Sequence, residues 1–357
     1  MIAQGEGALR LLAPSGYVED GSVDAQADWV TSFRRKTGCR VMLSTAASAG
    51  GLISQFKAGQ GGAYDGVLAP PQVAGQLIAG RDVAPVNVRL VNGYTSLSAE
   101  LRSLPGLRSG GNVYGIPYAW ASYVLGYNTS RVKPAPRGWG AIFDPASAAR
   151  NAGKITLPDS PLTIALAALY LKSAQPSLGI SNPYELTQPQ FDAAVRVLTG
   201  VRDDVSSFWS RDADAIGALG DGLDVLGAVA PHQVDDLMRA GRPAGSVSPA
   251  TGVTAYADSW LVSASAPDPY CMYQWLSWSI NPGVQEQVSV WTGLAPANPE
   301  VCARRDHRSC AVYHVADPAY MDKVAFAQLP VAQCGDARRS CVGYPQWQTA
   351  WSTIVSG

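Results

Sequence analysis

The sequence has few charged residues and almost no net charge. Charged side chains make up 15% of its 357 residues, and 27 Lys and Arg against 28 Asp and Glu leave a formal charge of -1. This balance cannot supply the counterion release on which nucleic-acid affinity depends, so DNA and RNA are not expected partners. The hydrophobic fraction of 47% is too high for a disordered chain, and we expect a folded protein.

Long apolar segments are missing as well. The longest run, TIALAALYL at residues 163–171, is about half of the roughly 20 residues that cross a bilayer as a helix. The sequence therefore predicts no membrane-spanning helix. Its length exceeds the roughly 250–300 residues at which a single hydrophobic core stops growing, so two lobes are expected.

Motifs of catalytic and metal sites are also absent. There is no G-x-S-x-G, H-E-x-x-H or G-x-x-x-x-G-K motif, and no G-x-G-x-x-G motif follows a predicted strand. Two of the three histidines, His307 and His314, flank Cys310, where a disulfide loop is favoured over a metal site. We expect no catalytic residue, no metal and no cofactor.

The six cysteines form no Cys-x-x-Cys pair of the kind found in zinc or thioredoxin-type redox sites, so disulfides are the better interpretation. Cys302 with Cys310, and Cys334 with Cys341, enclose short Arg-rich loops. Each of these two pairs is expected to form a local bond that staples its loop.

Cys39 and Cys271 can be joined only if the fold brings an early strand beside a late helix; otherwise they are two unpaired buried thiols. Disulfides indicate an oxidising compartment outside the cytoplasmic membrane. The first ten residues lack the charged and apolar regions of a signal peptide. We therefore expect the mature chain of a periplasmic or extracellular protein, from which a signal or lipid anchor was removed.

Strand-like and helix-like patterns alternate over the first 80 residues. Predicted strands cover residues 8–13, 39–44 and 64–68, and predicted helices cover 24–37, 48–59 and 72–79. This order favours a mostly parallel sheet with helices on both faces. Ligands of such sheets gather at the carboxyl ends of the strands.

The same alternation returns later in the chain and indicates a second α/β lobe. Its predicted strands are 154–157 and 223–229, and its predicted helices are 162–172 and 190–205. Two extended stretches, 113–128 and 253–263, are expected to cross from one lobe to the other, and the second leads into a helix at 269–279. These crossings predict a hinge of two strands.

Several motifs in this order carry a resemblance to a known family. They are Ser15-Gly16-Tyr17-Val18, Tyr64-Asp65-Gly66-Val67, Gly115-Ile116-Pro117-Tyr118, Tyr256-Ala257-Asp258-Ser259 and Pro296-Ala297-Asn298. Along most of its length the chain resembles the spermidine/putrescine-type extracellular solute-binding proteins of bacterial ABC importers. The resemblance implies a two-lobed α/β periplasmic-binding-protein fold of type II, in which one small ligand is enclosed by hinge closure.

In that fold each lobe contains a mostly parallel sheet flanked by helices. We expect residues 1–124 with 257–297 to form lobe 1, and residues 125–256 with 298–357 to form lobe 2. A disulfide-stapled, Arg-rich insert at 302–341 has no counterpart that we can place in the family. We interpret this insert as a surface decoration or as a contact for the transporter.

The resemblance also implies ligand contacts. Asp258 stands where the family has a carboxylate that pairs with a ligand amine, and Tyr256 stands where an aromatic ring packs against the alkyl chain of the ligand. Ser15 and Tyr17 lie in the first loop that contacts the ligand. The alternatives are a capping or bridging role for Asp258 and ordinary loop roles for Ser15 and Tyr17.

Four further residues complete the predicted ligand-binding set. Asp159 follows a strand of the second lobe, where the family has an acidic contact, although it is equally suited to cap the next helix. Gln72 stands where the family has a tyrosine after the third strand. Trp120 and Trp260 are expected near the ligand, with core packing of the hinge strands as the alternative.

Departures from the family decide the expected ligand. Pro14, Pro70, Gln72, Leu162 and Ala230 replace contacts of the polyamine site. The expected solute is therefore a small cationic or amine-bearing, polyamine-like molecule, and a zwitterion or quaternary ammonium compound is the alternative.

The function expected from these observations is that of an extracellular receptor. It captures its solute and presents it, as a monomer, to the permease subunits of an ABC importer. Two alternatives come from other classes of protein. One is an extracellular enzyme that uses Asp258 and Asp159, and the other is a sensory or adhesive lipoprotein that binds a partner through its disulfide loop.

Overall fold

The computed structural model describes residues 7–59, 62–304, 308–335 and 339–357. The chain forms two compact units: Met1–Trp120 with Tyr256–Met321 make unit 1, and Ala121–Ala255 with Asp322–Gly357 make unit 2. The chain passes between the two units three times. The first two passages lie within a few residues of the predicted boundaries at 124 and 256. The third lies at 321/322, whereas 297/298 was predicted, so residues 298–304 and 308–321 belong to unit 1.

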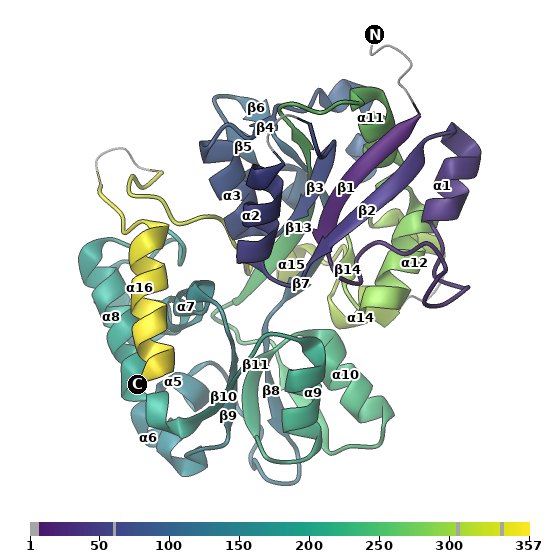
Figure 1. The fold of residues 1–357 in the computed structure, drawn as a ribbon. Helices are drawn as coiled ribbons and strands as arrows, with labels where there is room; N and C mark the ends of the chain where they lie inside the picture. Colours follow the sequence, from purple (N-terminus) through teal and green to yellow (C-terminus); the bar gives the residue numbers. More distant parts are fainter. Residues whose placement is uncertain (1–6, 60–61, 305–307, 336–338) are drawn as a thin grey trace. The chain divides into compact units, whose positions relative to one another are not determined.

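Most of a mixed sheet of eight strands lies in unit 1 and forms its centre (Figure 1). Its main order is β14 (Ala295–Pro296), β7 (Gly115–Ser122), β13 (Val253–Ser263), β3 (Gly66–Ala69), β1 (Ala8–Pro14) and β2 (Arg40–Ala46). Two short strands, β4 (Val83–Ala84) and β15 (Val324–Phe326), also pair with β13, and β15 does so within unit 2. As predicted, β1 is parallel to β2 and β3.

The helices of unit 1 match the predicted alternation in type, but their bounds differ. They are α1 (Val30–Thr37), α2 (Ala49–Ala58), α3 (Pro71–Ala79), α4 (Ala99–Arg102), α11 (Pro269–Ser279), α12 (Pro282–Thr292), α13 (Glu300–Arg304), α14 (Arg308–Val312) and α15 (Pro318–Met321). The predicted helix 24–37 begins only at Val30. Its first residues form turns instead, because Asp24 and Asp28 accept hydrogen bonds from the backbone amides of Gln26 and Thr31, both at 2.8 Å.

Aromatic side chains fill the core of unit 1. Phe33 of α1 meets the edge of Trp275 of α11 at 5.0 Å between ring centroids, and Trp275 meets Trp260 of β13 at 5.6 Å. Trp260 also contacts Tyr118 of β7 at 5.9 Å and is fully buried. The structure thus places Trp260 in the packed interior, which is the alternative stated for it above.

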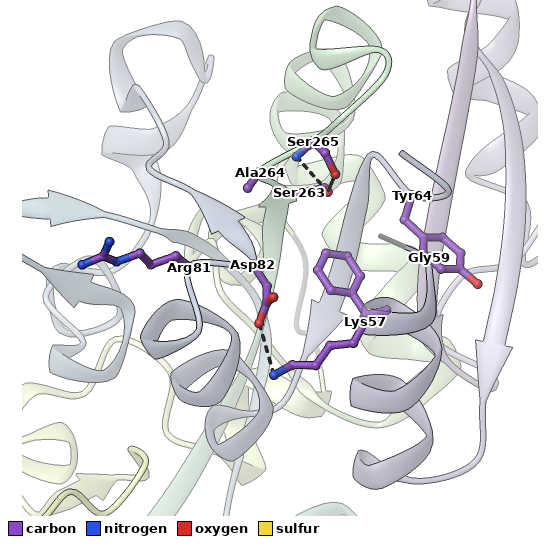
Figure 2. Close-up of a pocket in the computed structure, with 9 residues that line it drawn as sticks. Lys57, Gly59, Tyr64, Arg81, Asp82, Ser263, Ala264 and Ser265 are labelled. Carbon is purple, nitrogen blue, oxygen red and sulfur yellow. Dashed lines mark hydrogen bonds and ion pairs between the residues drawn. The ribbon is translucent and has the colours of Figure 1, made fainter. Parts of the chain in front are cut away.

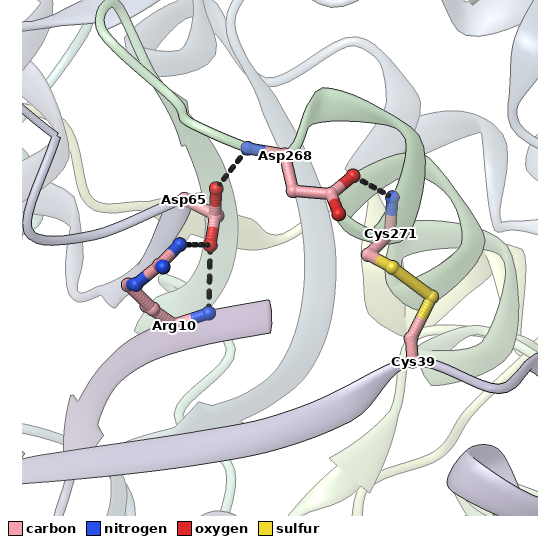
Figure 3. Close-up of polar contacts among 5 residues, drawn as sticks. All are labelled: Arg10, Cys39, Asp65, Asp268 and Cys271. Atoms are coloured by element: carbon pink, nitrogen blue, oxygen red, sulfur yellow. Dashed lines mark hydrogen bonds and ion pairs between the residues drawn. A yellow bond between two sulfur atoms is a disulfide. The ribbon is translucent and has the colours of Figure 1, made fainter. Parts of the chain in front are cut away.

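All six cysteines form disulfides, which confirms the two local bonds and decides the open question on the third. Cys39, just before β2, is joined to Cys271 in the first turn of α11 (Figure 3). The Asp268 carboxylate caps the same turn by accepting from the Cys271 amide at 3.0 Å. The local bonds join Cys302 to Cys310 and Cys334 to Cys341.

A buried carboxylate connects this disulfide to the central strands. Asp65 accepts from the backbone amides of Asp268 at 2.6 Å and Arg10 at 2.7 Å, and the Arg10 guanidinium lies 3.7 Å from it (Figure 3). Burial raises the pKa of Asp65, although these hydrogen bonds and the nearby guanidinium oppose the rise. The start of β1, the start of β3 and the start of α11 are thereby tied together.

Unit 2 is built around a five-stranded sheet with the order β10 (Val205–Trp209), β9 (Ile155–Pro158), β11 (Leu226–Val229), β8 (Val124–Asn128) and β12 (Ala244–Val247). Its helices are α5 (Gly140–Phe143), α6 (Pro145–Ala148), α7 (Ile164–Ala174), α8 (Gln188–Gly200), α9 (Asp212–Gly220), α10 (Pro231–Arg239) and α16 (Tyr344–Ser356). β9 is parallel to both β10 and β11. The predicted helix 190–205 ends at Gly200 as α8, and the strand β10 that follows was not predicted.

The C-terminal helix α16 completes unit 2. Trp347 contacts Phe191 of α8 at 5.6 Å between centroids, and Trp351 meets the edge of Phe208 of β10 at 5.2 Å. The Arg202 side chain donates to the backbone oxygen of Ile354 at 2.9 Å. Among the helices of the described ranges, none is both long and apolar enough to cross a membrane.

Candidate functional site

The carboxyl edge of the unit 1 sheet brings together parts of the chain that are far apart in sequence. β1 and β3 end there at Pro14 and Ala69. β13 runs antiparallel to β3 with Ser259 opposite Ala69, so Asp258 reaches the same edge. Loops at this edge are where open α/β sheets hold their ligands.

Asp258 is the dominant electrostatic feature of this edge. Its side chain is almost completely buried, with the residue 3% exposed. Burial raises the pKa of Asp258 from 3.8 to about 7, and a hydrogen bond with the Tyr17 side chain opposes the rise. Near neutral pH the carboxyl group is therefore poised between its two protonation states, and a nearby cation would stabilise the charged one.

Tyr17 is held in place through the backbone of its own loop. The Tyr118 hydroxyl donates to the backbone oxygen of Tyr17 at 3.1 Å, and the Trp291 indole N–H donates to that of Gly16 at 2.9 Å. The Gln285 side chain in turn donates to the backbone oxygen of Tyr118 at 2.8 Å. Strand β7 and helix α12 therefore position the loop that reaches Asp258.

Replacing Tyr17 by phenylalanine is expected to raise the pKa of Asp258 above about 7, because the hydrogen bond that stabilises the carboxylate is lost. The pKa can be followed by carboxyl 13C NMR with selective labelling. Tyr127→Phe, which removes a hydroxyl from β8 of unit 2, is the control. An unchanged pKa in Tyr17→Phe would contradict the assigned contact.

The other predicted residues of unit 1 occupy different environments. Tyr256 is half-buried and lies two positions before Asp258, hence on the same face of β13. Ser15 is exposed in the turn after β1, and Gln72 is half-buried in the first turn of α3. Trp120 is buried and its indole N–H donates to the backbone oxygen of Pro296 at 3.1 Å.

Glu19 is a residue of this edge that sequence reasoning missed. It is 7% exposed and follows Tyr17 in the same loop. Burial and then the neighbouring Asp20 raise its pKa, and a hydrogen bond with Trp291 opposes the rise. The sequence signal for Glu19 was the acidic pair Glu19-Asp20 that follows Tyr17 closely, although this pair did not indicate that Glu19 is buried.

In unit 2, Asp159 lies directly after β9 and is exposed. Its carboxylate accepts from the Trp351 indole N–H at 2.9 Å and the Ser210 hydroxyl at 3.4 Å. The capping role considered for Asp159 belongs to Ser160, whose hydroxyl accepts from the Leu162 amide at 3.2 Å. Asp159 is therefore held at the carboxyl edge of the unit 2 sheet.

A second carboxylate that was not predicted lies at the amino end of α9. Asp212 accepts from the Gln233 side chain at 2.5 Å, and His232 Nε2 lies 3.3 Å from its other oxygen. Burial acts to raise the pKa of Asp212, but the interactions with His232 and Gln233 outweigh it, so the pKa is lowered. Asp212 thus stays ionised, and its charge is directly paired.

A small pocket lies at the opposite end of the unit 1 sheet (Figure 2). It has a volume of about 170 Å³ and its lining includes Lys57, Asp82 and Ser263. Lys57 Nζ lies 3.4 Å from Asp82, whereas the Arg81 side chain points away from this pair. Ser263 ends β13, so this pocket is at the amino ends of the parallel strands, and the carboxyl edge remains the better candidate.

No group of three or more His, Cys, Asp or Glu side chains able to hold a metal occurs in the ranges that the structure describes. Taken separately, the carboxyl edge of each unit offers at least one carboxylate together with tyrosine or indole groups. Such a set suits the binding of an organic cation.

Comparisons with known proteins point to one family. A family model described as bacterial extracellular solute-binding protein matches residues 28–309. The chain is 23% identical over 309 residues to the spermidine/putrescine-binding periplasmic protein of Escherichia coli K12, covering 84% of each sequence. It is 24% identical over 311 residues to the putrescine-binding periplasmic protein of the same organism, covering 84% of this chain and 82% of the relative.

Comparison with solved structures shows which fold the chain has. A spermidine/putrescine ABC transporter substrate-binding protein from Streptococcus pneumoniae superimposes with a TM-score of 0.75 at 16% identity, covering 98% of this chain and 97% of that one. At this identity the likeness concerns the fold, which is the two-lobed type II fold of periplasmic binding proteins.

Proposed function

The chain belongs to the bacterial extracellular solute-binding proteins, and we propose that it is the receptor of an ABC importer for a small amine of the polyamine class. Its relatives are named as binding proteins and not as enzymes. In this proposal the protein acts as a monomer, binds its solute outside the cytoplasmic membrane and delivers it to permease subunits. The three disulfides suit that oxidising location.

The observation that carries the proposal is the buried carboxyl group of Asp258 at the carboxyl edge of unit 1. A buried carboxylate is costly unless it meets a cation, and an ammonium group supplies both the charge and hydrogen-bond donors. Tyr17 and Tyr256 add aromatic faces, each worth roughly 0.5–2 kcal/mol towards a cation. This edge therefore suits one end of an alkyl amine.

Unit 2 also carries carboxylates that suit an ammonium group. Asp159 is exposed at the carboxyl edge of its sheet and is fixed by Trp351 and Ser210. Asp212, at the amino end of α9, stays ionised as well. Each unit thus offers its own carboxylate to an ammonium group, and a diamine carries two such groups, whereas a monoamine or a zwitterion carries one.

The test is calorimetric titration with putrescine and spermidine at pH 8, where Asp258 is charged. We expect at least one of them to bind at micromolar concentrations, and a ligand present at 100 times its Kd stabilises the folded protein by about 2.7 kcal/mol. Butylamine, which matches putrescine but lacks one ammonium group, is the control and is expected to bind at least tenfold more weakly.

Two results would overturn the proposed ligand class. One is that neither polyamine binds while glycine betaine or a γ-amino acid does, which assigns a zwitterion. The other is equal affinity for butylamine and putrescine, which removes any role for a second ammonium group.

A further inference from the structure

Unit 1 contains a second pocket, next to two of the places where the chain passes into unit 2. It has a volume of about 210 Å³. Trp120 and Met321, which line it, are the last residues of unit 1 before two of the three passages. Tyr17, Tyr256 and Asp258 are not among its lining residues.

The lining of this pocket is mostly apolar and contains one carboxylate. The indole of Trp120, the thioether of Met321 and the rings of Pro296, Pro299 and Pro318 form its walls. Its volume exceeds the roughly 150 Å³ of an apolar cavity that binds benzene. It therefore has room for a molecule slightly larger than one aromatic ring.

Glu100 is the charged residue of the lining. It is exposed in the first turn of α4, and its carboxylate makes no hydrogen bond or ion pair within the described part of the chain. A carboxylate beside an indole and a thioether is the set of groups that attracts an ammonium group on an apolar body.

The walls of the pocket are held by contacts of their own. The Trp120 indole N–H is bonded to Pro296, and the Trp120 ring packs on Tyr313 at 5.6 Å between centroids. The backbone amide of Ser98 donates to the oxygen of Ala297 at 3.2 Å. The pocket is thus formed in advance, which lowers the entropy that a ligand loses on binding.

One wall comes from the cysteine-rich insert that the family resemblance leaves without a role. Val315, Ala316, Pro318 and Met321 all lie within it. The backbone of Ala316 is left-handed, with φ 66°, and that of His314 is also left-handed, with φ 52°. Non-glycine residues in this conformation are strained, and such strain gathers at sites that clamp ligands.

From this geometry we propose that the pocket is a second ligand site, for a small hydrophobic compound that carries one ammonium group. The apolar body lies against Trp120, Met321 and the prolines, and the ammonium group meets Glu100 at the rim. The insert contributes the strained wall, and Trp120 serves this site rather than the solute of the carboxyl edge.

Phenethylamine is the probe, and 2-phenylethanol is its matched neutral control. We expect calorimetry to show binding of phenethylamine at least fivefold tighter than binding of the alcohol. Hydrogen exchange in a peptide covering residues 312–321 should slow when the amine is added. Equal affinity for the two compounds, or unchanged exchange in this peptide, overturns the proposal.

Two variants locate the bound probe. Glu100→Gln is expected to weaken the binding of phenethylamine at least fivefold. Asp24→Asn, which removes an exposed charge outside the pocket, should leave that affinity unchanged. Asp258→Asn should also leave it unchanged. If binding is lost in Asp258→Asn but kept in Glu100→Gln, the amine binds at the carboxyl edge and the proposal is overturned. The proposal is also overturned if phenethylamine does not bind at millimolar concentration. A failure of putrescine to bind concerns only the proposed solute.

Discussion

Replacing Asp258 by asparagine is expected to weaken putrescine binding strongly and, at the same time, to make the ligand-free protein more stable at pH 8. The folded pKa of Asp258 is about 7, against an ordinary value of 3.8. Between these values the folded chain binds more protons than the unfolded chain, so stability falls as the pH rises from about 4 to about 7. Above pH 7 the loss is complete and amounts to at most about 4 kcal/mol.

Asparagine has no charge to bury, so the variant escapes this loss. Urea unfolding of the ligand-free proteins at pH 4, 6 and 8 measures the effect. The stability advantage of Asp258→Asn should be largest at pH 8 and should vanish near pH 4. Identical pH profiles for the two proteins would show that Asp258 does not titrate with a raised pKa.

The same substitution tests the binding role. Loss of a charged partner from a buried ammonium contact costs about 2–5 kcal/mol, so we expect the affinity for putrescine to fall at least 30-fold at pH 8. Asp203→Asn, which removes an exposed charge of unit 2, is the matched control and should bind normally. If the variant is more stable but binds putrescine with full affinity, the buried carboxylate is not part of the solute site.

Removing the Cys39–Cys271 disulfide is expected to have the second large effect, on stability. The bond joins residues 232 positions apart, and closing a loop of that size lowers the entropy of the unfolded chain by an amount worth about 5 kcal/mol. The local bond Cys302–Cys310 spans only 8 positions and is worth about 2.5 kcal/mol on the same scale. Both bonds lie in unit 1, which makes them a matched pair.

Urea unfolding of the Cys39→Ala/Cys271→Ala and Cys302→Ala/Cys310→Ala variants compares the two bonds. Both variants should lower the transition of unit 1 and leave that of unit 2 in place, and the first should lower it more. Equal losses would mean that the long bond acts by local strain or packing around Asp268 and not through the unfolded chain.

The alternation of strands and helices could be predicted because it depends on local periodicity. The parallel β1, β2 and β3 and the helices between them follow from that pattern, with errors at their ends. The side chains of Asp24 and Asp28 accept backbone hydrogen bonds in the turns before α1, so the helix begins later than predicted. The spacing of hydrophobic residues does not reveal such bonds. The strand β10 was missed because the predicted helix was extended past Gly200 to Val205, which is the first residue of β10.

The sequence by itself determined the class of fold, the family resemblance and the two short disulfides, since closing a loop of a few residues needs no knowledge of the rest of the chain. Only the tertiary structure decided that Cys39 meets Cys271 and that Tyr17 meets Asp258. It also placed Trp260 in the core and Trp120 against the insert. These outcomes depend on strand order and register, which bring together residues more than a hundred positions apart and set how deeply each is buried. Burial in turn decides the pKa of Asp258, a property that no residue carries on its own.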